Sequence, residues 1–292
     1  WVFSAGTPQH DEKRLRLAEE LAERSRQGMN FLILAMVLWN IVQTFLEFGQ
    51  RRRAEDIMAE MRTMAEHSGQ PNLLVLSMIN DAIMAIWDGR LDEAVAIRRQ
   101  AVARAEELGI SEFAAMWSTW VLPARVYLGD AGRALELNLQ ASRDRSWNAG
   151  DGMTILFCLA HLGQHAEVAE MLERLVVARP GIGSAQDESS IVLDTRLLEA
   201  AVLTGHRREA EILLHRQAGS SGRTTGMWLT TCVGRHLGAA AAFLGRPDEA
   251  RKYYQEAIKV CTEMRFRPEL ALTRLQLAEL LLEHYPSEKA EA

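Results

Sequence analysis

The chain has 292 residues, of which 48% are hydrophobic and 25% are charged, a balance typical of soluble globular proteins. Its 33 lysines and arginines against 39 aspartates and glutamates give a net charge of −6, which argues against nucleic-acid binding by this segment. The three cysteines, Cys158, Cys232 and Cys261, lie in apolar stretches without metal-ligand spacing. We expect them to be buried thiols in a reducing, cytoplasmic environment.

The apolar run FLILAMVLW at 31–39 is the one segment that resembles a membrane span. It is shorter than the ~20 apolar residues that cross a bilayer, and Asn40, Gln43 and Glu47 follow at once. We therefore predict a buried helix and no membrane contact. The first residues have no signal-peptide pattern, and the chain opens without a methionine, so we expect a fragment of a longer protein.

Glycines that end an apolar helical run recur along the whole chain. They stand at Gly49, Gly89, Gly129, Gly163, Gly205 and Gly245, with Tyr285 in the equivalent place, at steps of 40, 40, 34, 42, 40 and 40 residues. An alanine follows five residues after each of these glycines except Gly163. Self-similarity at a fixed period is the sequence signature of a helical-repeat protein.

Each repeat is predicted to consist of a helix, a tight turn and a second helix. The first helix is nearly apolar throughout, as at 72–87, and the second is amphipathic, as at 92–108. Glycine supplies the left-handed conformation that closes the first helix. The polar loops at 178–190 and 219–226 are expected to be the most flexible segments, and the 34-residue step is expected to change the local curvature.

We predict an all-α fold, because no stretch alternates convincingly between apolar and polar residues. A lone helix around 10–27 precedes about seven antiparallel helix pairs, the last cut short. These pairs are expected to stack, each on its neighbours, into one right-handed superhelix, an α-solenoid that spans residues 1–292 as a single domain.

Residues 233–258, VGRHLGAAAAFLGRPDEARKYYQEAI, resemble a tetratricopeptide repeat. The characteristic positions of that family's repeat motif hold Leu237, Gly238, Ala241, Leu244, Gly245, Ala250, Tyr254 and Ala257. The other repeats keep the glycine and the alanine, but their ~40-residue period exceeds the usual ~34 of the family. With the segment at 264–282, the resemblance implies the carboxyl-terminal repeat region of a large bacterial signalling protein, with a nucleotide-cyclase or transcription-regulator domain and an ATPase core upstream.

The resemblance also implies a concave groove, lined by first-helix residues six and ten places before each turn. In this chain those places hold Trp39, Gln43, Ile79, Ile83, Thr119, Pro123, Met153, Phe157, Thr195, Glu199, Arg235 and Ala239. Such a surface, aromatic at one end and charged at the other, suits an amphipathic helix or an extended segment with apolar anchors. The alternative is that several of these residues simply pack between repeats.

No motif in the sequence predicts catalysis, a cofactor or a metal. The loop GSSGRTTG at 219–226 lacks the lysine of a phosphate-binding loop, and no nucleophile elbow occurs. His161 and His165 are four residues apart, but Gly163 stands between them at a predicted turn, which disfavours a metal site. The basic run at 51–53 is expected to be solvated surface charge.

Two functions fit this pattern. The leading hypothesis is a non-catalytic interaction or scaffold module, regulatory in role, that binds a peptide, a helix or a neighbouring domain in the concave groove. The alternative is a small-molecule-sensing segment that controls an upstream ATPase, nucleotide cyclase or transcription-regulator domain. The apolar faces of exposed end repeats also favour a homodimer.

Overall fold

The computed structural model describes residues 6–24, 26, 31–143, 149–184 and 186–285. Within these ranges the chain forms helices and connecting loops, and no β-sheet is present; a single isolated bridge joins Thr224 to Cys232. The predicted all-α fold is confirmed. The hydrophobic side chains collect in two main clusters, one formed largely by the first half of the chain and one largely by the second half.

The helices follow one another with short connections. In chain order they are η1 (Pro8–His10), α2 (Asp11–Glu23), α3 (Phe31–Glu47), α4 (Arg51–Ser68), α5 (Pro71–Trp87), α6 (Leu91–Glu107), α7 (Ser111–Trp117), η2 (Ser118–Val121), α8 (Pro123–Tyr127), α9 (Ala131–Arg143), α10 (Ala149–His161), α11 (His165–Leu172), η3 (Glu173–Val177), α12 (Ile191–Leu203), α13 (Arg207–Gln217), α14 (Val233–Phe243), α15 (Pro247–Glu263) and α16 (Arg267–His284).

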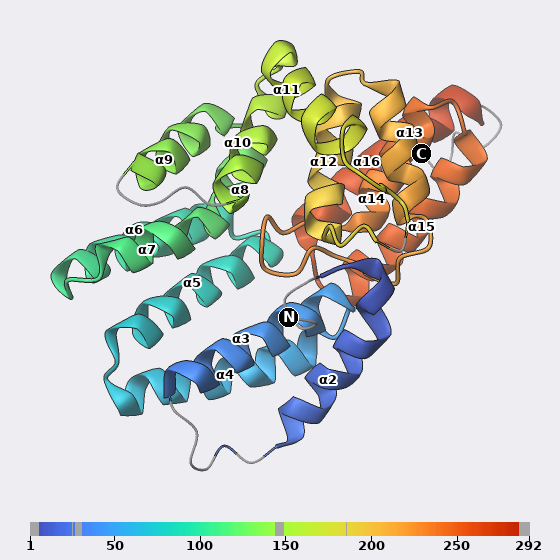
Figure 1. Ribbon diagram of the computed structural model, residues 1–292. Helices are drawn as coiled ribbons and strands as arrows, with labels where there is room; N and C mark the ends of the chain where they lie inside the picture. The colour runs from blue at the N-terminus through green and yellow to red at the C-terminus, as the bar shows by residue number, and fades with distance from the viewer. Residues whose placement is uncertain (1–5, 25, 27–30, 144–148, 185, 286–292) are drawn as a thin grey trace.

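Neighbouring helices pack against each other in chain order, for example α3 with α4, α5 with α6, α12 with α13 and α14 with α15 (Figure 1). The six glycines of the predicted turns all have positive φ, between 68° and 82°, as expected for the left-handed residue that ends a helix. At Gly89, for example, the N–H of Arg90 donates to the carbonyl of Ala85 at 2.8 Å, which satisfies an acceptor at the helix end.

Helices α14 and α15 are in close contact. Gly238 of α14 lies against the ring of Tyr254 of α15, and a Cβ at that position would be 2.5 Å from the Tyr254 Cδ1. Ala241 and Ala257 are fully buried in the same region. Small residues on α14 therefore let the aromatic side chain of α15 approach the helix backbone.

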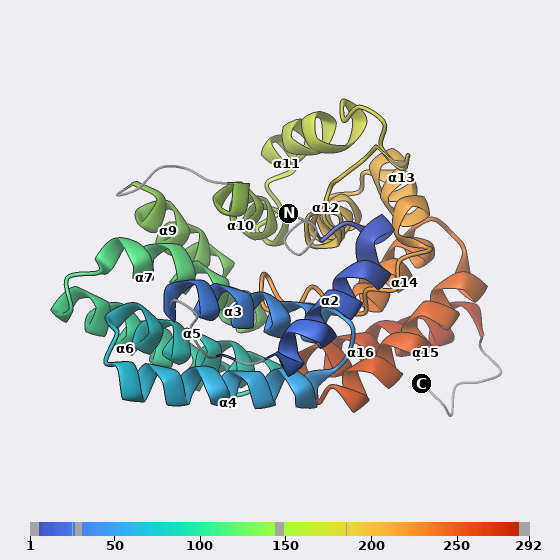
Figure 2. The ribbon, with the colours of Figure 1, turned by 60° about the horizontal axis from the view of Figure 1, so that its bottom comes forward.

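The first and last parts of the chain also meet, so the contacts are not confined to neighbours. Helix α16 packs on α5 (Figure 2). The rings of Trp87 and Phe266 stack there with their centroids 4.2 Å apart. Arg51 donates to the carbonyl of Met264 at 2.7 Å and pairs with Asp88 at 2.6 Å. The expectation that Arg51 is a solvated surface charge was wrong, because this contact buries its side chain to 5% exposure.

Both loops that were expected to be flexible contain buried polar residues with partners elsewhere in the chain. In the first, Asp187 is buried and pairs with Arg216 at 2.9 Å and with Arg179 at 3.3 Å. In the second, Thr224 and Thr225 are fully buried. The composition of these loops suggested solvation, but long-range partners satisfy their polar groups.

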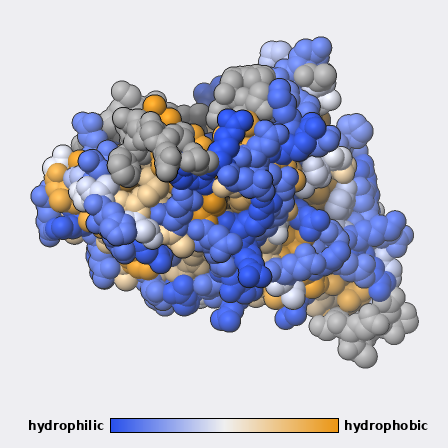
Figure 3. Space-filling view, turned by 90° about the horizontal axis from the view of Figure 1, so that it is seen from below, coloured by the Kyte–Doolittle hydropathy of each residue, from blue (hydrophilic) through white to orange (hydrophobic). Residues whose placement is uncertain are grey.

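The apolar run near residue 31 lies in α3, as predicted, but only one face of it is buried: Leu34, Leu38 and Trp39 are buried, whereas Ile33 and Met36 are exposed. Among the described residues, none of the helices combines the length and apolar character needed to cross a bilayer. The face seen in Figure 3 is largely hydrophilic, with hydrophobic residues in small, separate patches. Cys158, Cys232 and Cys261 are free thiols and are buried, as expected.

Candidate functional site

A pocket of ≈ 330 Å³ lies between α8, α10, α12, α14 and α16. Its apolar lining consists of Val126, Val202, Leu203, Ala239 and Leu272. Its aromatic and polar lining consists of Tyr127, Phe157, His161, Arg196, Glu199, Arg235, His236 and Gln276. A pocket of this size, mostly apolar with a few convergent polar groups, is the usual form of a small-molecule site.

Helical spacing explains why these residues share one cavity. On each contributing helix the lining residues are mostly three or four positions apart, which places them on one helix face. They are Phe157 and His161 on α10, Arg196, Glu199 and Leu203 on α12, Arg235 and Ala239 on α14, and Leu272 and Gln276 on α16. The pocket is thus assembled from five helices that lie far apart in the sequence.

Arg235 and Glu269 form a buried ion pair beside the pocket. The Arg235 Nε donates to Glu269 Oε2 at 2.7 Å, and the same oxygen accepts the backbone N–H of Cys232 at 2.9 Å. The hydroxyl of Tyr127 donates to Glu269 Oε1 at 2.6 Å. Burial opposes ionisation of Glu269, but Arg235 and these hydrogen bonds outweigh it and hold the pKa of Glu269 at about 2.

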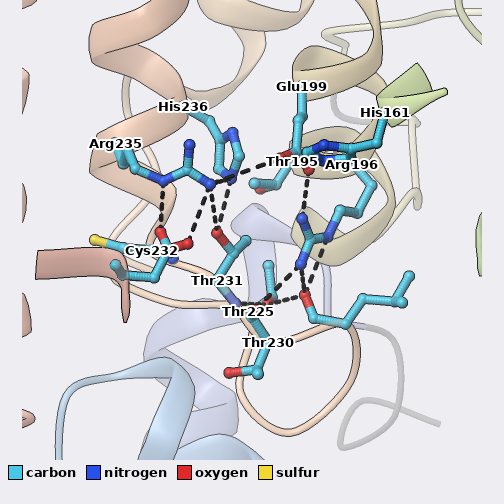
Figure 4. A network of polar contacts seen from close by, with 12 residues as sticks. His161, Thr195, Arg196, Glu199, Thr225, Thr230, Thr231, Cys232, Arg235 and His236 are labelled. Carbon is cyan, nitrogen blue, oxygen red and sulfur yellow. Dashed lines mark hydrogen bonds and ion pairs between the residues drawn. The ribbon is translucent and has the colours of Figure 1, made fainter. Parts of the chain in front are cut away.

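Arg196 connects the pocket to the loop that precedes α14, as Figure 4 shows. It forms a short ion pair with Glu199, and its Nε donates to the carbonyl of Leu229 at 3.0 Å. Its guanidinium carbon lies 4.2 Å from the ring centre of Phe157. Burial raises the pKa of Glu199, but the charge of Arg196 more than reverses this, and the pKa lies well below its usual range.

His236 is a neutral, fully buried part of the wall. Its Nε2 lies 3.1 Å from Arg235 Nη2 and 2.8 Å from the hydroxyl of Thr231 (Figure 4). Because an arginine can only donate, Nε2 accepts and the ring carries no charge. Burial, and then the charge of Arg235, lower the pKa of His236 to about 3.

The charges around the pocket are therefore balanced. Arg196 is paired with the carboxylate of Glu199, and Arg235 with that of Glu269. Neither arginine is therefore left unpaired to attract a charged ligand. Gln276 is different, because its Oε1 is buried without a hydrogen-bond partner among the described residues. An acceptor of this kind favours a ligand that brings an N–H or O–H donor.

Three buried ionisable groups at the pocket have pKa values far from neutral. Glu199 and Glu269 have lowered pKa values and His236 titrates near 3, so none of the three exchanges a proton near neutral pH. Burial raises the pKa of the Cys158 thiol to about 12. In the described part of the chain no cluster of His, Cys, Asp and Glu could hold a metal ion. His161 contacts Glu199 at 3.3 Å, and His165 contacts the carbonyl of Thr204 at 3.3 Å.

The structure brings some of the predicted groove residues together in this pocket, namely Phe157, Glu199, Arg235 and Ala239. The others lie elsewhere, and most are packed: Trp39, Ile79, Ile83, Thr119, Pro123, Met153 and Thr195 are buried. Trp39 packs edge-on against Trp117 and Trp120, with ring centroids 4.7 and 4.6 Å apart. Gln43 is half-buried, and its Nε2 donates a hydrogen bond to the backbone carbonyl of Thr225. A binding role for this set stays a prediction.

Sequence reasoning missed Tyr127, Arg196, His236 and Gln276 as pocket residues. A signal existed for Arg196, because it is a charged residue within the largely apolar helix α12, one turn before Glu199. No comparable signal marked Tyr127, since its partner Glu269 is 142 positions away. No protein-family model matches the sequence, and no curated protein matches it significantly.

Proposed function

We propose that this chain is a non-catalytic, regulatory helical-repeat module that binds a small molecule in the pocket between α8, α10, α12, α14 and α16. The observation that carries the proposal is the ≈ 330 Å³ cavity, lined by residues from successive repeats. We further propose that the repeats form a tetratricopeptide-like superhelix of about seven pairs. The regular left-handed turns and the contact of Gly238 with Tyr254 support that proposal.

The ligand is a neutral, ring-containing molecule with at least one N–H or O–H donor. The paired arginines and glutamates leave no net charge for an ion to neutralise. The apolar wall, with Leu203 and Leu272, accepts a hydrocarbon edge or ring, and Gln276 accepts a donor. A strongly anionic ligand would have to displace Glu199 from Arg196, which leaves a buried charge without its partner.

The position of the pocket supports the proposed regulatory role. Its walls come from helices of several repeats, so a bound ligand contacts them simultaneously and restricts their relative movement. The pocket joins helices from different parts of the chain, so a ligand that binds it favours one placement of these helices relative to one another. Through this change in helix arrangement, ligand binding would alter the activity of an upstream ATPase, nucleotide-cyclase or transcription-regulator domain in a longer protein.

A thermal-shift screen of neutral metabolites tests the proposal. A ligand at about 100 times its Kd stabilises the folded chain by about 2.7 kcal/mol, which raises the Tm by roughly 5 °C.

Replacing Gln276 with methionine removes the unpartnered acceptor while nearly preserving the shape of the side chain, and should weaken the binding of a ligand found in the screen about tenfold. The same change at the exposed Gln255 of α15 is the control and should leave the shift unchanged. No hit among neutral ring compounds, or equal shifts for both variants, would contradict the proposal.

A protein or peptide partner is the second candidate function. The observation that favours it is Gln43, a predicted groove residue, whose side-chain amide already binds a backbone segment of this chain. Repeat arrays commonly present such surfaces to extended segments or loops.

A further inference from the structure

A separate cavity, of ≈ 450 Å³, lies where the first and last parts of the chain meet. Its lining includes Asp88 and Arg90, from the turn between α5 and α6, and Arg265 and Arg267, from the junction of α15 and α16. The two turns touch, because a Cβ at Gly89 would be 3.3 Å from the Cβ of Arg267. This cavity shares no lining residue with the pocket of the candidate functional site.

Three arginines but only one carboxylate, that of Asp88, line the cavity. Asp88 is already paired with Arg51 at 2.6 Å and with Arg90 at 3.1 Å. Burial raises the pKa of Asp88, but the hydrogen bonds and charges of these two arginines more than reverse this and lower it. Asp88 is therefore ionised and paired, and it leaves Arg265 and Arg267 to meet another anion.

The arginines of the cavity are weakly paired or unpaired. Arg267 is exposed and has no hydrogen-bond or ion-pair partner among the described residues. Arg265 pairs with Glu55, and Arg90 pairs with Glu93, but every side chain in these two pairs is at least 35% exposed. Exposed ion pairs contribute little to stability, so an incoming anion can compete with both carboxylates.

Arg265 has a backbone conformation that favours glycine. Its φ is 51°, in the left-handed region, and it ends α15, where the N–H of Phe266 donates to the carbonyl of Cys261 at 2.8 Å. The end of α6 has the same hydrogen-bond pattern, but there the left-handed residue is Gly109. An arginine in this conformation costs stability that a glycine does not. The fold alone favours glycine at this position, so the arginine indicates another role.

We propose that this cavity binds the phosphate or diphosphate group of a small molecule, held by Arg265 and Arg267 with Arg90 beside them. A guanidinium group pairs two of its N–H donors with two oxygens of an anion. A phosphate group has enough oxygens and charge for more than one arginine, whereas a single carboxylate has two oxygens. The cavity has room for an organic part next to Leu270. The site does not depend on the neutral ligand proposed above, so either proposal can fail alone.

Calorimetric titration with inorganic pyrophosphate tests the proposal. Wild type should bind it, and Arg267→Gln should weaken binding about tenfold or more. Arg274→Gln is the matched control, because Arg274 is also an exposed residue of α16 without a partner in the described part of the chain, but lies outside the cavity. Its Kd should stay within about twofold of wild type.

Arg265→Gly separates binding from folding. Glycine adopts the observed φ without strain, so the variant should have a Tm at least as high as that of wild type. It lacks one guanidinium group, however, and should bind pyrophosphate about tenfold or more weakly. Wild-type affinity in Arg265→Gly would overturn the proposal. No binding to wild type, or equal weakening by Arg267→Gln and Arg274→Gln, would also overturn it.

Discussion

His236 is neutral in the folded chain because burial and the neighbouring Arg235 disfavour its charged form. Its pKa is about 3, against an ordinary 6.5. Between these values the unfolded chain binds a proton that the folded chain does not, so His236 lowers stability progressively as the pH falls below 6.5. Glu199 and Glu269 face the same ring and stay ionised in this window.

His236→Gln should therefore have a flatter stability profile. We expect wild type to lose about 1–2 kcal/mol more than His236→Gln when the pH is lowered from about 7 to 5. Urea unfolding at both pH values measures the difference. An identical loss in the two proteins would show that His236 is not held neutral.

The buried pair of Arg235 and Glu269 gives a second prediction at the residue scale. Glu269→Gln removes the charge that balances Arg235 and should lower the free energy of unfolding by about 3–5 kcal/mol. Arg235→Met combined with Glu269→Gln leaves no unpaired charge and should be less unstable than Glu269→Gln alone. Denaturant unfolding of the variants checks this order, and the reverse order would refute the pairing.

The contact between α14 and α15 depends on a glycine that leaves no room for a side chain. Gly238→Ala places a Cβ 2.5 Å from Tyr254 and should destabilise the chain by about 1–3 kcal/mol. Gly132→Ala, in α9, is the opposite case, because its Cβ meets nothing within 4 Å. That change should stabilise by about 0.5–1 kcal/mol through helix propensity. Thermal unfolding of the two variants should show Tm shifts of opposite sign; shifts of the same sign would contradict the packing.

Secondary structure was predictable at the element scale because local signals specify it. Turn glycines such as Gly89 and Gly245 close helices through bonds between residues close in the chain, so their spacing alone indicates where each first helix ends. The interruption of the third repeat at η2 and α8 was not predicted. Pro123 begins α8 there, and its fixed φ suits the first turn of a new helix.

The arrangement of the whole molecule was less accessible from sequence. Arg51 was interpreted as a surface charge because no residue near it in the sequence indicates a partner. Its acceptor, the carbonyl of Met264, lies 213 positions away. The loop at 219–226 was interpreted as a flexible linker for the same reason, since its partners on α3 are remote in the chain. Of the pocket, only Phe157, Glu199, Arg235 and Ala239 followed from the repeat register. The other lining residues depend on how helices distant in the sequence are placed against one another.

If several helices together bind one small neutral ligand, a side chain that fills the pocket should prevent binding. Ala239→Phe tests it most directly, because Ala239 lines the pocket and a phenyl ring fills it without removing any polar group. Calorimetric titration of the best ligand from the screen should show binding weakened about a hundredfold or more in Ala239→Phe and retained in Ala239→Ser. A Kd for a folded Ala239→Phe within about twofold of wild type would contradict the claim.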